Sequence, residues 1–467
     1  MTHVNVLATP AKWPRLLIPA TPLARPANLD AAVKAGAFTA LRKALGELGA
    51  AATIAEVTKS GLRGRAGVGF PAGEKWRQCA LTAADRRYVV VNACQSDPAV
   101  MTDRMLLELN PYAVLEGAAI GAFAVNAREV IVAVRAEATD AIRVLEDAIA
   151  AAEKAGYLGD TVMGTASEIH ISVKALQGAY MLGEETVLLK GIEGKRGQPE
   201  QQPPYPSTSG LFGRPTLIHS PQTFAEIPTI VNGALDIPVA APRAAASARA
   251  AAARAAAAAA SGAATSSGPG TILVQISGAV VNPGVAEVPL GTTIAAIVDL
   301  AGGVAPGTKL KALLVGGPSG GILPPGALKT PYQHDTLEAA GAYVGSGSIV
   351  VIDQTTCLVD LAAVLTRYCA DEACGKTIPC RIGLRRMAEI GARICEGQPR
   401  GDELTRLADL STDIVASSLC DHERRSTLSL LCIVRYFRDE LDAHLINSTC
   451  PAGTCQMMAV SRVRAGS

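Results

Sequence analysis

The sequence predicts a multidomain protein of the α/β class: a large α/β domain, then a small α+β module, then a C-terminal helical bundle. Three observations support this prediction. The 467 residues are too many for one compact core, so two to four domains are expected. Strand-like and helix-like runs alternate over residues 51–238, which indicates a layered domain with a largely parallel sheet. Residues 351–446 are helical in pattern and contain most of the late cysteines.

Residues 1–50 are expected to be a lead-in that contains one helix, Leu29 to Leu48, with Asn28 as its N-cap. In the α/β domain, two strands and one long helix are expected at 88–91, 130–134 and 137–155. The most apolar run, Tyr112 to Val125, is interrupted by Glu116 and is too short to span a bilayer. It is therefore expected to be a buried helix.

A compositional break follows the α/β domain. Residues 239–270 are dominated by Ala, Ser, Gly and Arg without an apolar stripe, which predicts a linker. The module at 271–350 is expected to hold short strands at 272–276 and 313–315 and a helix at 294–300. Residues 447–467 form a tail that begins near the segment Cys450-Pro451-Ala452-Gly453-Thr454-Cys455.

Composition excludes several classes of protein. A net charge of +1 argues against nucleic acid as a partner. The N-terminus shows no basic region followed by an apolar segment, so neither a secretory signal nor membrane insertion is expected. We therefore expect a cytoplasmic protein. Nine of the eleven cysteines lie after residue 356. That clustering in a long chain favours a metal or iron–sulfur site over a disulfide framework.

The segment Ser60 to Trp76 is a glycine-rich loop, SGLRGRAGVGFPAGEKW. Glycines at this density let backbone amides approach a phosphate or a flat ring. Arg65 and Lys75 supply positive charge for a phosphate, and Phe70 can stack on a ring. The loop differs from the G-x-G-x-x-G dinucleotide fingerprint in order and in its preceding structure.

Further blocks follow in a fixed order: YMLGEET at 180–186, EGKRGQP at 193–199 and LFGRPT at 211–216. With the glycine-rich loop, these blocks resemble the flavin- and NADH-binding subunit of respiratory complex I and its relatives in soluble hydrogenases and formate dehydrogenases. The same resemblance covers 271–350, which is similar to the family's ubiquitin-like β-grasp domain, a packing and docking element.

The resemblance implies an FMN site formed by Gly64, Arg65, Gly67, Lys75, Asn92, Tyr180, Gly183, Glu184 and Glu185. It implies that Phe70 and Phe212 flank the adenine of NADH. Hydride would pass from NADH to the flavin, and single electrons would leave through iron–sulfur clusters. No side chain is assigned as catalytic, because the cofactor performs the chemistry. The implied partners are other subunits of a multisubunit oxidoreductase, among them a small ferredoxin-like iron–sulfur subunit.

Several positions depart from the family pattern. The family's N-A-D-E-G-E-P-G segment is here Asn92-Ala93-Cys94-Gln95-Ser96-Asp97-Pro98-Ala99, and Gln202 replaces a lysine. His219 and Ser220 replace paired asparagines near the expected FMN phosphate. These side chains still form hydrogen bonds, so a pocket is expected to persist with altered orientation or specificity.

The cysteine motif is also altered. The family pattern C-G-K-C-T-P-C-R, with a distant fourth cysteine, is here Cys374 to Arg381 with Thr377 at the second cysteine. Cys374, Cys380 and Cys420 remain as the expected ligands. They can hold a 3Fe–4S cluster, or a 4Fe–4S cluster with a non-cysteine ligand, and Cys369 is a further candidate for the missing thiolate. Alternatively, the cluster is lost and the thiols are ordinary buried residues.

The tail cysteines Cys450 and Cys455 resemble a C-P-A-x-x-C element of the hydrogenase-type relatives. They can bind a metal together with His422 or His444, or serve no metal at all. For the whole chain, the leading hypothesis is an electron-transfer flavoprotein subunit. The alternatives are a non-catalytic paralogue that acts in assembly and a flavoprotein with a donor other than NADH.

Overall fold

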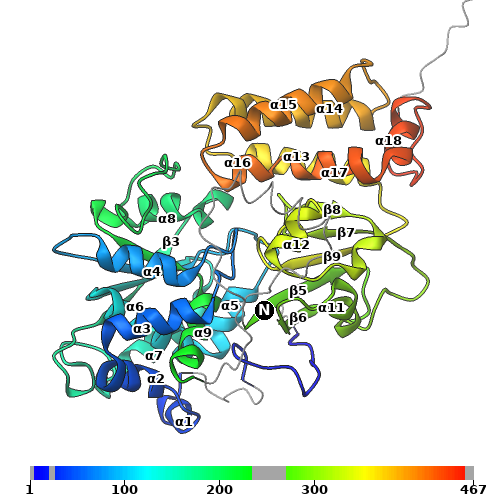
Figure 1. Cartoon of the computed structure of the whole chain (residues 1–467). Helices are drawn as coiled ribbons and strands as arrows, with labels where there is room; N and C mark the ends of the chain where they lie inside the picture. The colour runs from blue at the N-terminus through cyan, green and yellow to red at the C-terminus, as the bar shows by residue number, and fades with distance from the viewer. Residues whose placement is uncertain (1–4, 20–26, 234–269, 458–467) are drawn as a thin grey trace, which may run out of the picture.

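The computed structural model describes residues 5–19, 27–233 and 270–457. The expected linker at 239–270 lies outside these residues except for Gly270. The described chain forms an α/β lobe, a lobe built on a second sheet, and a layer of helices above that second sheet (Figure 1). The α/β class, the second sheet and the C-terminal helices agree with the prediction.

The first sheet is parallel, with strand order β3-β2-β1-β4. Its strands are β1 (Tyr88–Ala93), β2 (Glu129–Arg135), β3 (His170–Leu176) and β4 (Thr216–His219). Side chains alternate along β1, so that Val89 and Val91 join the main core while Val90 joins a smaller core with Ile218. Both faces are therefore covered, as a parallel sheet requires.

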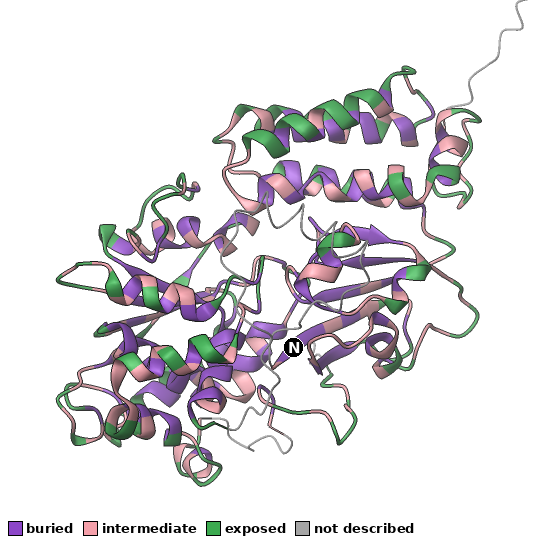
Figure 2. Cartoon of the chain, viewed as in Figure 1, coloured by how far each residue is buried: buried purple, intermediate pink, exposed green. Residues whose placement is uncertain are grey.

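Helices cover the two faces of this sheet. Those of the α/β lobe are α1 (Leu29–Lys34), α2 (Thr39–Lys43), α3 (Gly49–Ser60), α4 (Ala72–Leu81), α5 (Thr102–Leu109), α6 (Pro111–Val125), α7 (Thr139–Lys154), α8 (Glu185–Ile192) and α9 (Pro221–Val231). Helices α6 and α9 pack against each other and against β1, whereas α8 covers the opposite face through Leu188 and Leu189. The run predicted as a buried helix is thus α6, and Figure 2 shows buried residues gathered on the strands of both sheets.

The prediction of a single helix at 29–48 is wrong. Asn28 does cap α1, accepting the Ala31 N–H at 3.0 Å, but the chain breaks at Gly36 and Phe38, which have φ of 105° and 64°. The Glu116 carboxylate of α6 accepts the N–H groups of Phe38 (2.8 Å) and Leu41 (3.0 Å). The one acidic residue of the apolar run therefore caps α2, and a π-helical turn over Ala44–Leu48 joins α2 to α3.

The second sheet is mixed, with strand order β6-β5-β9-β7-β8. Its elements are β5 (Thr271–Gly278), β6 (Gly284–Pro289), α11 (Ile294–Leu300), β7 (Leu310–Val315), β8 (Gly321–Leu323), α12 (His334–Ala339) and β9 (Ser348–Asp353). One face packs on α11 and α12. Leu273 and Val285 of the other face join the main core of the α/β lobe, so the two lobes share apolar packing. The N-terminal segment is held to β6, where Glu287 accepts the N–H groups of Leu17 and Ile18.

The C-terminal helices cover the remaining part of the second sheet (Figure 1). They are α13 (Leu358–Asp371), α14 (Leu384–Cys395), α15 (Glu403–Ser417), α16 (Asp421–Arg425), α17 (Leu428–Tyr436) and α18 (Arg438–Leu445), with a π-helical turn at Pro379–Gly383. In the described part of the chain, no helix is long and apolar enough to cross a membrane.

Gly117 fixes the contact between α6 and α9. A Cβ at Gly117 would lie 1.9 Å from the Phe224 carbonyl oxygen, whereas one at Gly121 would lie 3.2 Å from an edge atom of the Phe224 ring. We expect Gly117→Ala to lower the free energy of unfolding by about 1–3 kcal/mol, because two backbones must separate. The measurement is the thermal unfolding midpoint. Gly121→Ala is the matched control, and an equal loss in both variants would contradict this explanation.

Candidate functional site

The predicted flavin residues lie around the carboxyl ends of β1 and β4. Asn92 is near the end of β1, and His219 ends β4 beside Val91 in the register of the two strands. In parallel sheets this edge is where loops gather ligand-binding groups. The loops that follow β1 and β4, the glycine-rich loop and the start of α8 all meet here.

The glycine-rich loop joins α3 to α4 and is closed by backbone pairing. Gly64 N–H donates to the Phe70 carbonyl at 2.9 Å, and Ala72 N–H donates to that of Leu62 at 2.8 Å. Gly67 has a φ of 62°, and a Cβ there would meet nothing within 4 Å. The side of Gly67 where a Cβ would stand is therefore open to a flat or anionic group, while the Gly67 backbone pairs with Gly345 of the second-sheet lobe.

Arg65, predicted to contact the FMN phosphate, has its guanidinium in the protein core. Its side chain and that of Glu226 on α9 are fully buried and form an ion pair, with Nε to Oε1 at 3.2 Å. The Arg65 N–H also donates to the Thr223 hydroxyl at 3.0 Å. The side chain of Arg65 thus fixes the loop to α9, and sequence reasoning missed Glu226 as its partner.

Lys75 lies beside the carboxyl end of β4. Its ammonium group pairs with the Glu185 carboxylate and lies 3.3 Å from the carbonyl oxygen of Ile218, next to the end of β4. Lys75 and Glu185 are partly exposed, at 19% and 34% of their side chains. The structure therefore brings two predicted residues together and leaves a cation within reach of a ligand.

His219 and Ser220, which replace the family's asparagines, are buried. The Trp76 indole N–H donates to His219 Nε2 at 3.1 Å. Burial, with Lys75 close by, holds the pKa of His219 well below its usual value, so the ring is neutral. Ser220 is the N-cap of α9. The start of this helix therefore faces the same edge of the sheet, and helix N-termini favour anions.

Asn92 and Gly183 form the next contact, since the Asn92 amide donates to the Gly183 carbonyl at 2.9 Å. Gly183 permits a close approach, because a Cβ there would lie 1.7 Å from Ser96 Oγ. Glu184 caps α8 by accepting the N–H groups of Thr186 (2.9 Å) and Val187 (2.8 Å). Its carboxylate is thus used inside the fold, and burial raises its pKa.

The two predicted adenine-flanking rings are both exposed. Phe70 is 39% exposed on the glycine-rich loop, and Phe212 is 58% exposed in a turn with a φ of 53°. The Phe212 ring meets the Tyr88 ring edge-on at 5.8 Å, and its N–H donates to Glu193 at 2.7 Å. A backbone conformation that disfavours side chains is thus held in place to present an aromatic ring to solvent.

The altered segment after β1 is held within the fold. Gln95 donates to the Thr102 hydroxyl at 3.1 Å and accepts the Asp103 N–H at 3.1 Å. Asp97 is buried and accepts a hydrogen bond from Ser346, at the second sheet, at 3.0 Å. These two residues therefore join neighbouring elements.

The second-sheet lobe contacts the glycine-rich loop directly. His334, the first residue of α12, hydrogen-bonds the Gly64 carbonyl through Nε2 at 3.1 Å, and its ring fills the space beside Gly69. Asp335 pairs with Arg63 at 3.1 Å. Burial lowers the pKa of His334 to about 3, so its neutral ring carries the proton on Nε2. No motif marked His334, because its role depends on contact between distant segments.

Tyr180 lies where the flavin-side loop meets the C-terminal helices. Its N–H donates to Glu372 at 2.6 Å, and its ring centroid is 5.4 Å from that of His422. Its hydroxyl is 3.1 Å from that of Ser319, and burial raises its pKa well above the usual value. A predicted flavin residue is therefore in contact with the cysteine region.

The three predicted cluster ligands lie at one end of the helical layer. Cys374 follows α13, Cys380 lies in the π-helical turn, and Cys420 precedes α16. Burial raises the pKa of Cys380 to about 12, with Glu423 and Cys374 as neighbouring charges, and Cys380 is in turn a neighbouring charge of Cys420. Cys380 is therefore within electrostatic range of both other thiols.

Thr377, at the position of the missing cysteine, donates to Glu423 Oε1 at 2.6 Å. The other oxygen of Glu423 accepts the Leu419 N–H at 2.9 Å. An oxygen donor pair thus stands beside the three thiols. Three thiols with oxygen donors suit an iron–sulfur cluster with one non-cysteine corner. The flavin-side residues likewise suit FMN, through the open side of Gly67, the Lys75 cation and the start of α9.

Three protein families match the chain. Residues 57–229 match the Nuo51 FMN-binding domain, 360–444 match the NADH-ubiquinone oxidoreductase-F iron-sulfur binding region, and 273–323 match the SLBB domain. The matches coincide with the α/β lobe, the C-terminal helices and the second sheet. The chain therefore has an FMN-binding domain and an iron–sulfur binding region in the order that its motifs predict.

Similar proteins point to the same family as these domain matches. The chain is 36% identical to the F 2 subunit of NADH-quinone oxidoreductase from Rhizobium meliloti (strain 1021), over 89% of this chain and 94% of the relative. It is 36% identical to the HndC subunit of the NADP-reducing hydrogenase from Solidesulfovibrio fructosivorans, over 92% of this chain and 83% of the relative.

A structure of NAD+-reducing [NiFe]-hydrogenase in the H2-reduced state superimposes with a TM-score of 0.71 at 30% identity. That match covers 84% of this chain, which spans 62% of the hydrogenase chain. Sequence identity, domain order and fold thus agree, and the chain belongs to the family of NADH-quinone oxidoreductase F subunits and their hydrogenase relatives.

Proposed function

We propose that this chain is an electron-transfer flavoprotein subunit that oxidises NADH at a bound FMN and delivers electrons to an iron–sulfur cluster. One observation supports the proposal most: flavin-side and cluster-side residues touch. Tyr180 contacts Glu372 and His422. Burial raises the pKa of Cys420, and the nearby Glu184 carboxylate raises it further. Two redox groups held by these residues would be neighbours.

On the flavin side, this chain's residues bind and orient. Lys75 neutralises phosphate charge, the N-terminus of α9 at Ser220 adds backbone donors, and the open side of Gly67 leaves room for the ligand. Bound FMN would supply hydride acceptance and single-electron release, chemistry that no side chain provides. Phe70 and Phe212 offer exposed rings for a nucleotide base.

On the cluster side, Cys374, Cys380 and Cys420 are the proposed thiolate ligands, and Thr377 with Glu423 occupies the fourth corner. Both oxygen-bearing side chains are already aligned by their hydrogen bond. Because an oxygen ligand binds iron more weakly than a thiolate does, we propose that this corner is labile.

The family assembles as subunits of larger oxidoreductases, as the names of the relatives state. For this chain we propose a small ferredoxin-like iron–sulfur subunit as the immediate partner. We also propose a cytoplasmic location, because none of the eleven cysteines, all of which lie in the described residues, is joined in a disulfide, as is usual in a reducing compartment.

A second function is favoured by three motif residues that already have partners and by one altered residue. Arg65, Lys75 and Glu184 already have partners within the fold, and Thr377 replaces a thiolate. A non-catalytic assembly subunit would keep these contacts without any cofactor. The two functions differ in whether the purified chain holds a flavin that responds to NADH.

The first test is the anaerobic absorbance spectrum of the purified full chain, before and after NADH is added. We expect a flavin band that bleaches, because the geometry leaves a cation and the open side of Gly67 near the carboxyl edge of the sheet. A colourless protein would support the assembly role. A flavin that ignores NADH would indicate another electron donor.

Lys75→Met tests the flavin site. We expect the dissociation constant for FMN to rise about 10- to 100-fold, since a charge-assisted hydrogen bond contributes about 1.5–3 kcal/mol. Fluorescence quenching of FMN on binding measures the constant. Lys154→Met, on the exposed end of α7, is the matched control. Equal FMN affinity in both variants would show that Lys75 does not contact the flavin.

Thr377→Cys tests the fourth corner of the cluster. We expect the variant to gain a thiolate and to hold its iron more tightly, because sulfur replaces oxygen at one ligand position. Electron paramagnetic resonance and iron analysis of the anaerobic protein report cluster type and content. Thr412→Cys, exposed on α15, adds a thiol elsewhere and serves as control. Unchanged spectra and iron in Thr377→Cys would contradict the assignment.

A further inference from the structure

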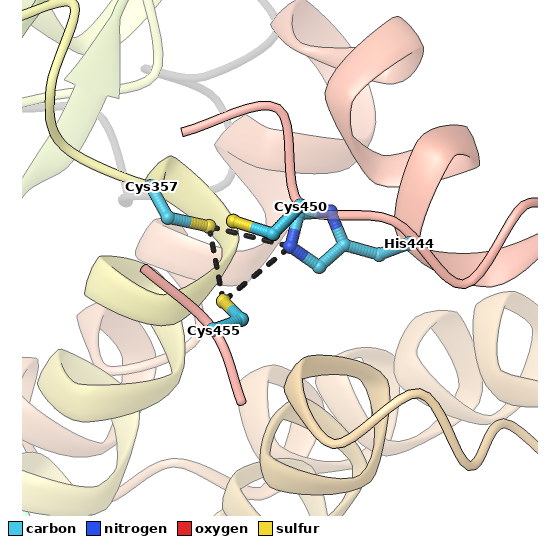
Figure 3. A group of neighbouring side chains, drawn as sticks. All are labelled: Cys357, His444, Cys450 and Cys455. Carbon is cyan, nitrogen blue, oxygen red and sulfur yellow. Dashed lines mark hydrogen bonds between the residues drawn. The ribbon is translucent and has the colours of Figure 1, made fainter. Parts of the chain in front are cut away.

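Three cysteines and a histidine meet at the far end of the helical layer, outside the proposed cluster site. They are Cys357, His444, Cys450 and Cys455, and their side chains point toward one another in Figure 3. Their sulfur and nitrogen atoms all lie within 4.8 Å of one another. None of these residues belongs to the Cys374, Cys380 and Cys420 group.

The sequence brings these four groups together from three segments. Cys357 is the N-cap of α13, and His444 lies in the last turn of α18. Cys450 and Cys455 lie in the tail that follows α18, where Gly453 N–H donates to the Cys450 carbonyl at 2.9 Å. Pro451 and Gly453 favour this turn, which folds the tail so that both thiols face His444.

The distances suit a single metal ion. Cys357 Sγ is 3.4 Å from His444 Nε2 and 3.5 Å from Cys455 Sγ, and Cys455 Sγ is 3.5 Å from His444 Nε2. In a tetrahedral zinc site, with Zn–S of about 2.3 Å and Zn–N of about 2.0 Å, ligand atoms are about 3.5–3.8 Å apart. A cubane cluster would hold the sulfurs further apart, since each would bind a different iron.

The histidine is oriented as a metal ligand. His444 is fully buried, and its Nδ1 lies 2.8 Å from the Glu440 carbonyl oxygen. Because a carbonyl only accepts, Nδ1 carries a proton, and Nε2 is the ring nitrogen that faces the three sulfurs. Such a hydrogen bond on the outer nitrogen is typical of metal-binding histidines.

One backbone contact favours negative charge on Cys357. Asp360 N–H in the first turn of α13 points at Cys357 Sγ from 3.5 Å, at the positive end of a 14-residue helix. A disulfide between two of the cysteines would leave the third thiol and the Nε2 lone pair without a role. A zinc ion uses all four groups.

We propose that Cys357, His444, Cys450 and Cys455 bind one zinc ion, which fastens the C-terminal tail to α13 and α18. Binding replaces the three thiol protons by Zn2+, and those protons pass to solvent. The ion is structural, because all four ligand positions come from the protein and no position is left for water or substrate. This site is independent of the proposed flavin and cluster chemistry.

The test is metal analysis of the full chain purified under reducing, anaerobic conditions, with zinc and iron measured separately. We expect one zinc per chain in the unaltered protein and at least a tenfold loss of zinc in Cys455→Ser, with iron unchanged. Cys395→Ser is the matched control, since Cys395 on α14 neighbours Cys455 but is not one of the four converging groups. Zinc-free protein, loss of iron in place of zinc, or loss of zinc in Cys395→Ser would overturn the proposal.

A second measurement covers the case in which Cys455→Ser does not fold. Protein produced with cobalt in place of zinc is expected to show the absorption bands of a tetrahedral thiolate–imidazole site. His444→Cys should retain the metal with shifted bands, because a fourth thiolate replaces nitrogen. Absent cobalt bands, or identical bands in His444→Cys, would exclude His444 and this ligand set.

Discussion

The ion pair of Arg65 and Glu226 is the interaction on which the rest of the structure depends. Both side chains are fully buried, and a buried charge without its partner destabilises a fold by several kcal/mol. Arg65 sets the glycine-rich loop, while Glu226 belongs to α9 and also accepts the N–H of Thr271 at 2.8 Å. Thr271 begins β5. One pair therefore fixes the loop, the helix that starts at the sheet edge and the first strand of the second sheet.

Much of the fold could be predicted because its signals are local. The buried strand runs form β1 and β2, and the helix expected at 294–300 is α11. The helix expected at 29–48 failed for a non-local reason. The break in this helix is stabilised by Glu116, which lies far away in the sequence. In the sequence, Glu116 is recognisable only as the one acidic residue in an apolar run. Capping by a remote side chain leaves no pattern near the helix that it caps.

In the candidate site, too, local signals could be predicted from the sequence and contacts between distant segments could not. Motifs marked Lys75, Asn92, Cys374, Cys380 and Cys420 as candidate ligands, because ligand chemistry restricts residue type and spacing. They did not identify Glu226, His334 or Glu423, whose roles arise from contacts between segments far apart in the chain. For Arg65, the motif predicted a cation in the glycine-rich loop. Only the packing of α9 shows that its guanidinium pairs with Glu226 in the core. His422 and His444 are equal candidates in the sequence, and they separate once α16 and α18 are placed.

The ring of His334 against Gly69 has a consequence for how the molecule can be divided. The loop that admits the flavin has one wall supplied by α12, and the apolar packing of the α/β lobe continues into Leu273 and Val285 of the second sheet. Apolar packing thus continues across the compositional break between the lobes. A fragment ending before β5 would retain every flavin motif while losing the surface of the second lobe that packs on them.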